Sequence, residues 1–122
     1  MNCHDYRCVL RYVAENDTLF VVSCTAALRE IFDLNDDCEG NPLGEELSAP
    51  LTRWIYHTLR YLVHGKRSIL AFKEYGKHFL AVKMSYEAPL LSICIQTFKN
   101  KMLFDRLYYS NNLSRISADR FF

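Results

Sequence analysis

Residues 20–32 read "FVVSCTAALREIF", and this stretch decides the fold. Its first half is rich in the β-branched and aromatic residues that favour strands. A helical pattern follows without an intervening loop, because Leu28, Ile31 and Phe32 recur at the spacing of one helix face. Thr25 stands at the joint, where its hydroxyl is a suitable N-cap acceptor for a backbone N–H of the helix. The stretch is therefore predicted to be a strand that leads directly into a helix.

The residues before this joint predict a second strand. Residues 7–14, "RCVLRYVA", are rich in β-formers, and the turn-forming residues "END" separate them from the run at residues 19–24. Two such runs with a short polar turn between them predict a β-hairpin. After the helix at residues 26–34, the stretch "NDDCEGNPLGEELSAP" is dominated by Asn, Asp, Gly and Pro. It is predicted to be a loop with at most short helical turns.

A longer helix is predicted next, beginning near Ser48 or Thr52 and ending at Gly65, a residue suited to a helix C-terminus. Its broad apolar stripe consists of Leu51, Trp54, Ile55, Thr58, Leu59, Leu62 and Val63. Three β-rich runs follow at residues 68–75, 77–86 and 91–98, the first two joined by a tight turn near Gly76. Their alternating pattern is typical of antiparallel strands with one buried face.

The element order is thus β-β-α-loop-α-β-β-β, with a helix-like tail at residues 99–122. The simplest two-layer arrangement is one antiparallel sheet with helices packed on one face. We expect an α+β fold with a five-stranded antiparallel sheet and a C-terminal helix. Residues 1–122 are expected to form a single domain whose core covers about residues 6–98.

Composition narrows the class of protein. The 122 residues are half apolar and 24% charged, which is typical of a globular domain. A formal net charge of +1 gives no electrostatic case for binding nucleic acid or an anionic membrane. Charged residues interrupt each apolar run well short of the roughly 20 residues of a transmembrane helix. The N-terminal "MNCHDYRCVL" lacks the apolar stretch of a signal peptide. The five cysteines are odd in number and irregularly spaced, which predicts reduced thiols and a cytoplasmic location.

With this element order the chain resembles a PAS domain. The resemblance extends from residue 6 to residue 98 and rests on four stretches in order: "YRCVLRYVAENDTLFVVSCTAALREIFDL", "CEGNPLGEEL", "LTRWIYHTLRYLVHGK" and "SILAFKEYGKHFLAVKMSYEAPLLSICIQTF". They are similar to the family's opening hairpin and first helix, its polar Gly-containing segment, its long helix and its last three strands. One departure is at the joint, where Ser23 and Cys24 stand near a position that the family often gives to Asn.

The resemblance implies a non-catalytic sensory or regulatory domain of signal transduction. Such domains hold a small molecule between sheet and helices, or dimerise, and pass the change to an effector protein. We expect the pocket walls to come from the inner sheet face and the facing helix stripe: Cys24, Trp54, Thr58, Leu80, Val82, Met84, Ile93 and Ile95. The alternative is that these side chains fill the core completely. A homodimer is expected, with a partner surface on the tail at Leu103, Phe104, Leu107 and Tyr108.

Two further functions remain open. One is a ligand-free interaction module of the same fold. The other is a small enzyme that uses Cys24, because a helix N-terminus lowers the pKa of a thiol and nucleophilic catalysis needs a nearby histidine base. No local catalytic motif surrounds Cys24, and its position in an apolar run favours a small buried residue.

Metal and cofactor sites are weakly indicated. Cys3, His4 and Cys8 lie close together, but a structural zinc site needs a second pair of ligands. Some PAS domains hold haem through a histidine on or near the long helix, and His57 or His64 could have this role. Both lie off the apolar stripe, which favours a solvated face. The flavin-binding subfamily carries a reactive cysteine in an Asn-Cys-Arg context, and this chain has "GNPLGEEL" there. The cofactor is therefore left unassigned.

Overall fold

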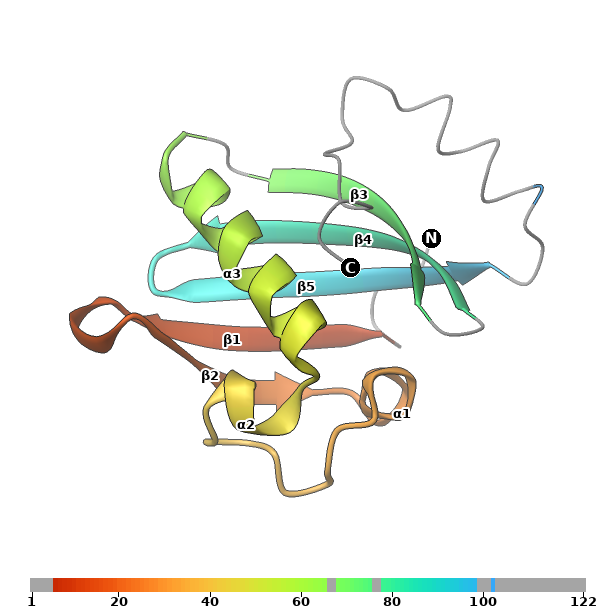
Figure 1. Ribbon diagram of the computed structural model, residues 1–122, viewed down its shortest axis with the longest axis horizontal. Helices are drawn as coiled ribbons and strands as arrows, with labels where there is room; N and C mark the ends of the chain where they lie inside the picture. The colour runs from red at the N-terminus through yellow and green to blue at the C-terminus, as the bar shows by residue number, and fades with distance from the viewer. Residues whose placement is uncertain (1–5, 66–67, 76–77, 99–101, 103–122) are drawn as a thin grey trace.

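The computed structural model describes residues 6–65, 68–75, 78–98 and 102. The strands are β1 (Arg7–Val13), β2 (Thr18–Cys24), β3 (Ser68–Tyr75), β4 (His78–Glu87) and β5 (Leu90–Phe98). A 3₁₀ turn, η1 (Ala14–Asn16), lies between β1 and β2, and the helices are α1 (Ala26–Phe32), α2 (Leu43–Glu46) and α3 (Ala49–Val63) (Figure 1).

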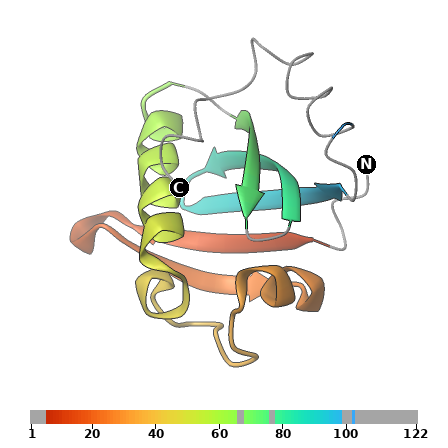
Figure 2. The same ribbon diagram turned by 45° about the vertical axis from the view of Figure 1, so that its right-hand side comes forward.

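The five strands form one antiparallel sheet in the order β2-β1-β5-β4-β3. Of these five strands, the first and the last along the chain, β1 and β5, are therefore neighbours near the middle of the sheet (Figures 1 and 2). This sheet and the helices confirm the predicted α+β class. The predicted strand and helix bounds also agree with the structure to within about two residues at most ends.

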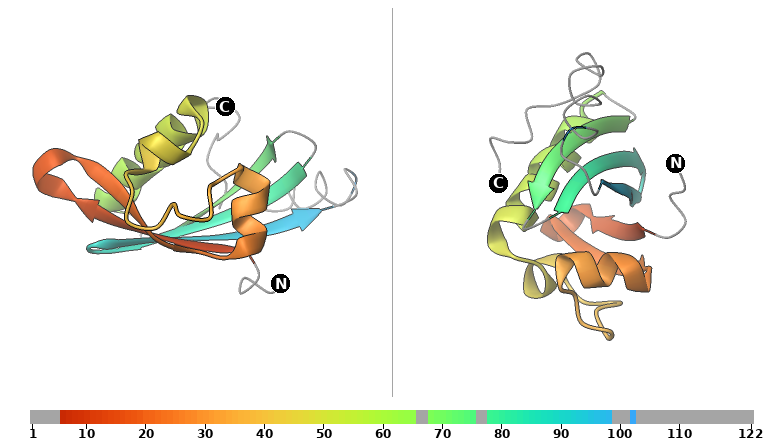
Figure 3. Two further views of the ribbon diagram at one scale, coloured as in Figure 1. Left: turned by 90° about the horizontal axis from the view of Figure 1, so that it is seen from below. Right: turned by 90° about the vertical axis from the view of Figure 1, so that its right-hand side faces the viewer.

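All three helices contribute to one core on the concave side of the curved sheet (Figure 3). Leu28 of α1, Leu43 of α2 and Leu59 of α3 belong to the same buried cluster as the inner-face residues of the strands. On β4 and β5 these inner-face residues are Leu80, Val82, Met84, Leu91, Ile93 and Ile95. Side chains alternate across a strand, so the predicted two-residue pattern selects the buried face correctly.

A second, smaller apolar cluster lies on the other face of the sheet. Phe72 of β3 and Ala81 of β4 are buried there, and three partly buried side chains pack against them, namely Leu70, Phe79 and Phe98. The strands β3 and β4 thus carry apolar side chains on both faces.

Helix α3 presents its predicted stripe to the core, with one exception. Leu51, Trp54 and Leu62 are buried, as the 3.6-residue period requires, but Val63 is 48% exposed. The prediction that Val63 belongs to the buried stripe is therefore wrong, because at 3.6 residues per turn Val63 falls beyond the edge of the arc that the buried residues occupy. The chain leaves the helix at Gly65, whose φ of 148° lies in the region that glycine adopts readily.

The turn between β1 and β2 is tied to α3 by polar contacts. Asp17 has a left-handed backbone (φ 49°), and its carboxylate accepts a hydrogen bond from the Tyr12 hydroxyl at 2.7 Å. The guanidinium of Arg60 binds the same carboxylate at 2.7 Å and lies over the ring of Tyr56. The hydroxyl of Tyr56 in turn accepts a hydrogen bond from the backbone N–H of Leu19, at 2.7 Å. These contacts fix the hairpin relative to the long helix.

The predicted C-terminal helix and the turn at Gly76 lie outside the described residues, apart from Met102, which is helical and exposed. The proposed partner surface at Leu103, Phe104, Leu107 and Tyr108 also lies outside them. In the described part, no helix has the length and apolar character needed to cross a membrane.

Candidate functional site

The strand-to-helix joint is held by backbone and side-chain hydrogen bonds to β1. The N–H of Thr25 donates to the carbonyl of Arg7 at 2.9 Å, and the N–H of Arg7 donates to the Thr25 hydroxyl at 3.1 Å. Thr25 is the N-cap residue of α1, but its side chain makes no capping bond to the helix. The prediction that its hydroxyl caps the helix is therefore wrong, because the neighbouring strand supplies the donor instead.

Cys24 forms a disulfide with Cys8. The two residues are register partners on β1 and β2, their Cα atoms are 4.2 Å apart, and both belong to the buried core. The prediction of reduced thiols is therefore wrong for these two cysteines. The prediction fails because the register of the folded β1–β2 hairpin places the two cysteines directly opposite each other. In this state Cys24 has no thiolate, so it cannot act as the nucleophile of the enzyme alternative.

The remaining described cysteines are Cys38, which is a buried thiol, and Cys94 on β5, which is half-buried. Burial raises the pKa of the Cys38 thiol, because an apolar environment disfavours the charged thiolate. Cys38 is therefore a poor candidate for a reactive cysteine.

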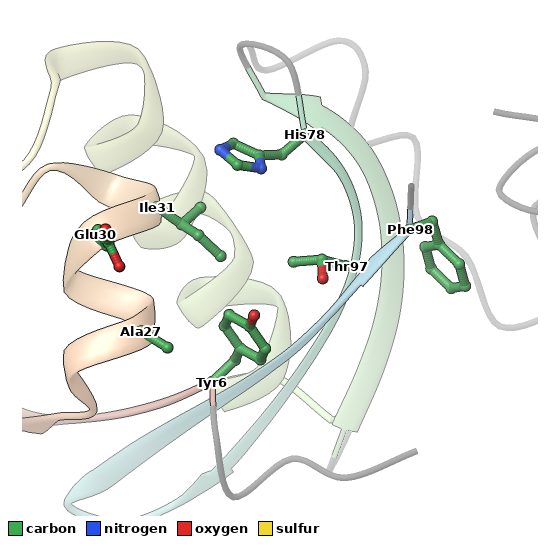
Figure 4. Close-up of a pocket in the computed structure, with 7 residues that line it drawn as sticks. All are labelled: Tyr6, Ala27, Glu30, Ile31, His78, Thr97 and Phe98. Carbon is green, nitrogen blue, oxygen red and sulfur yellow. The ribbon is translucent and has the colours of Figure 1, made fainter. Parts of the chain in front are cut away.

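A pocket of about 590 Å³ opens beside the joint, between α1 and the ends of β4 and β5 (Figure 4). We call it the α1 pocket. It is lined by Tyr6, Ala27, Glu30, Ile31, His78, Thr97 and Phe98. Small-molecule sites in proteins usually measure roughly 300–1,000 Å³, so this volume suits a small ligand.

Each wall of the α1 pocket is positioned by the fold. The carbonyl of Tyr6 accepts a hydrogen bond from the N–H of Ile95 at 3.0 Å, which continues the pairing of β1 with β5 to the pocket's edge. His78 is the register partner of Tyr75, whose ring packs edge-on against Phe32 of α1 with the ring centroids 5.5 Å apart. These contacts set the separation between helix and sheet at this end.

The chemistry of the α1 pocket is mixed. Figure 4 shows the hydroxyl of Tyr6, the side chain of Thr97 and the imidazole of His78 turned toward the space beside Ile31. The two hydroxyls can each donate and accept a hydrogen bond, and a neutral imidazole has one donor and one acceptor nitrogen. Ile31 supplies an apolar surface. The arrangement therefore suits a small molecule with an apolar body and one or two polar groups.

The predicted pocket-wall residues are brought together, but in the packed core. One buried cluster between α3 and the sheet contains all of Trp54, Leu80, Val82, Met84, Ile93 and Ile95, and Cys24 belongs to the same cluster. Thr58 is also buried, and its hydroxyl donates to the carbonyl of Trp54 at 2.9 Å. None of these residues lines the α1 pocket, and their role in ligand binding stays a prediction.

His57 and His64 lie on the exposed side of α3. With Arg60, Tyr61 and Gly65 they line a shallow hollow of about 460 Å³. Both histidines face away from the core, as their position off the apolar stripe predicts. Cys3 and His4 lie outside the described residues, and the described part brings no three His, Cys, Asp or Glu side chains into a group that could hold a metal ion.

No local pattern in the sequence pointed to Tyr6, His78 or Thr97 as pocket residues. They come from the entry to β1, the start of β4 and the end of β5, and only the sheet order places them around α1. No protein-family model matches this chain, and comparisons with curated proteins and with solved structures also find no match.

Proposed function

We propose that this protein is a PAS-like sensory or regulatory domain that binds a small molecule in the α1 pocket and passes the change to a partner. The element order is the one that the resemblance implies, from the opening hairpin through the long helix to the last three strands. The proposal rests on the α1 pocket itself, where the hydrogen-bonding side chains of Tyr6, His78 and Thr97 lie around the same space as the apolar side chain of Ile31. We further propose that the domain acts without catalysis, as a homodimer in the cytoplasm.

The pocket is well placed to transmit a signal. One of its walls is α1, which is bonded through Thr25 to the first residue of β1. Its other wall is formed by the ends of β4 and β5, and β5 pairs with β1. A ligand that changes the spacing between these walls would thereby act on the central strands of the sheet.

The first test is native mass spectrometry of the full chain. We expect a retained small molecule and a dimer mass. A fragment screen by two-dimensional ¹H–¹⁵N NMR then locates the site, with shift changes expected at Ala27, Ile31 and Thr97. A protein that retains no molecule and binds no fragment in the α1 pocket would overturn the proposal and favour the ligand-free interaction module.

Paired variants separate the α1 pocket from the hollow on α3. Losing one hydrogen bond costs about 1 kcal/mol, so we expect Tyr6→Phe or His78→Gln to weaken fragment binding about fivefold. The matched controls Tyr61→Phe and His64→Gln lie in the other hollow and should leave affinity within twofold. Equal losses in variants and controls would contradict binding in the α1 pocket.

A further inference from the structure

The Cys8–Cys24 disulfide lies at the open end of the β1–β2 hairpin. Cys8 is the second residue of β1 and Cys24 is the last residue of β2, whereas the turn η1 closes the other end. The disulfide therefore joins the two strands at the place where the chain enters the sheet and where it leaves for α1.

Both neighbouring segments are walls of the α1 pocket. Tyr6 precedes Cys8 by two residues, and α1 begins two residues after Cys24. Arg29 of α1 also reaches back, donating from Nη1 to the carbonyl of Cys24 at 2.6 Å. The disulfide is thus close in the chain to both α1 and Tyr6, and it helps to hold these two walls of the pocket relative to each other.

The pairing of the strands is irregular close to this end. The register of β1 with β2 shifts between Val9 and Leu10, which leaves two pairs, Cys8 with Cys24 and Val9 with Ser23, beyond the irregularity. These two pairs are separated from the regular part of the hairpin, so the covalent bond contributes more to holding them than it would in a continuous ladder.

The same end is accessible to a reagent after a small local opening. β2 is an edge strand, and Val22 and Ser23 beside Cys24 are exposed. The residues Cys8 and Cys24 are themselves only 4% and 7% exposed, so the disulfide is shielded while the strand end stays paired. Strand ends open more readily than the centre of a sheet.

We propose that Cys8 and Cys24 form a reversible redox switch that sets the mobility of the α1 wall of the pocket. This inference rests on the proposed function, since a disulfide in a cytoplasmic protein is usually a redox-sensing or transient one. A thiolate of a dithiol reductant attacks one sulfur of the disulfide and forms a mixed disulfide, which the second thiolate of the reductant resolves. Two electrons and two protons pass to the protein, giving two thiols, and the reductant is released as an intramolecular disulfide. The reverse exchange with an oxidised dithiol takes up the two electrons and two protons and restores the Cys8–Cys24 bond.

Reduction leaves both thiols at positions that suit small apolar side chains, so the fold persists. What is lost is the covalent tie at the base of α1. The helix is then held to β1 at this end by the Thr25 and Arg7 hydrogen bonds and by core packing. In the reduced protein α1 should therefore be more mobile, and the pocket should bind a ligand with lower affinity.

The test is amide hydrogen exchange, measured by mass spectrometry on the full chain before and after reduction by dithiothreitol. We expect the amides of residues 22–32 to exchange at least fivefold faster after reduction, while those of residues 51–62 stay within twofold. Peptide mapping without reductant should show Cys8 linked to Cys24. Absence of that link, or unchanged exchange at residues 22–32, would overturn the switch.

Two variants complete the test. Cys8→Ser combined with Cys24→Ser should show the fast exchange with or without dithiothreitol. Cys38→Ala removes a cysteine outside the disulfide and should keep the full response to reduction. If the double variant fails to fold, the comparison of oxidised and reduced wild-type protein alone decides the question.

The exchange measurement uses no ligand, so it separates the two proposals. Unchanged exchange in a protein that binds fragments in the α1 pocket would overturn only the switch. A redox response in a protein that binds no fragment there would overturn the sensory proposal and leave the switch as a property of the fold.

Discussion

Replacing Tyr56 by Phe tests how α3 supports the edge of the sheet. The hydroxyl of Tyr56 accepts a hydrogen bond of 2.7 Å from the backbone N–H of Leu19, a fully buried residue of the edge strand β2. The substitution keeps the aromatic ring but removes this acceptor. The N–H of Leu19 then loses its protein partner.

The expected cost follows from this geometry. A buried backbone donor left without a partner costs about 1–3 kcal/mol. The Tyr56 side chain is only half-buried, so water can replace part of the bond, and we expect a loss of about 1.5 kcal/mol. For a chain of this size, such a loss lowers the melting temperature by roughly 5 °C.

Urea unfolding followed by fluorescence measures this loss directly, because the single tryptophan, Trp54, is buried in the core. The midpoint should fall with an unchanged slope. The matched control is Tyr61→Phe on the same helix, whose side chain is 46% exposed and whose loss should change stability by less than about 0.5 kcal/mol. A Tyr56→Phe variant as stable as wild type, or an equal loss in the control, would refute the reasoning.

Three further outcomes are expected. Reduction of the disulfide should lower the free energy of unfolding by about 3 kcal/mol, because the crosslink closes a loop with a sequence separation of 16. Urea midpoints with and without dithiothreitol measure this loss. The Cys8→Ser, Cys24→Ser double variant should show the same midpoint with and without the reductant. The hydrogen bond to Asp17 raises the pKa of Tyr12 in the folded protein above the value near 10 of the unfolded chain. This contact therefore stabilises the fold fully below about pH 10, and its contribution to stability is lost as the pH rises through the higher pKa of the folded protein. Absorbance at 295 nm should show a late phase of phenol titration that is reduced in Tyr12→Phe, and an unchanged titration curve would contradict the assignment. Cys38, whose pKa is raised by burial, should react with Ellman's reagent only after urea is added, whereas rapid reaction of the native protein would show that the site is open.

Much of the fold could be predicted because its signals are local. The alternation from Phe79 to Tyr86 selects the buried face of β4, and the helical spacing of Leu51, Trp54 and Leu62 selects that of α3. The loop composition between α1 and α3 limits that segment to one short helix, α2. Each of these features depends on residues that are close together in the sequence.

The disulfide could not be predicted, because it depends on an irregular register between β1 and β2 that the sequence does not show. In the regular part of the hairpin Leu10 pairs with Val21, and that register would place Cys8 opposite Ser23. Only the irregularity between Val9 and Leu10 brings Cys8 opposite Cys24. The available signal was weaker, namely that two cysteines flank the predicted turn at nearly equal distances.

The α1 pocket could not be predicted either, because its walls meet only through the order of the strands. The sequence identified residues that face the core, such as Val82 and Ile93, and the core packs them against one another. Tyr6 and Thr97 were not singled out, since each lies at the end of a strand, where alternation gives little information.

The central place of β5 has a consequence for how the protein is made. β5 is the one strand of the sheet that pairs with both the β1–β2 hairpin and the β3–β4 hairpin. A nascent chain that ends before Leu90 therefore holds two separate two-stranded hairpins, and such hairpins have little stability alone. The sheet is completed only when β5 inserts between the two halves, so a chain that stops before Leu90 is expected to lack a stable sheet.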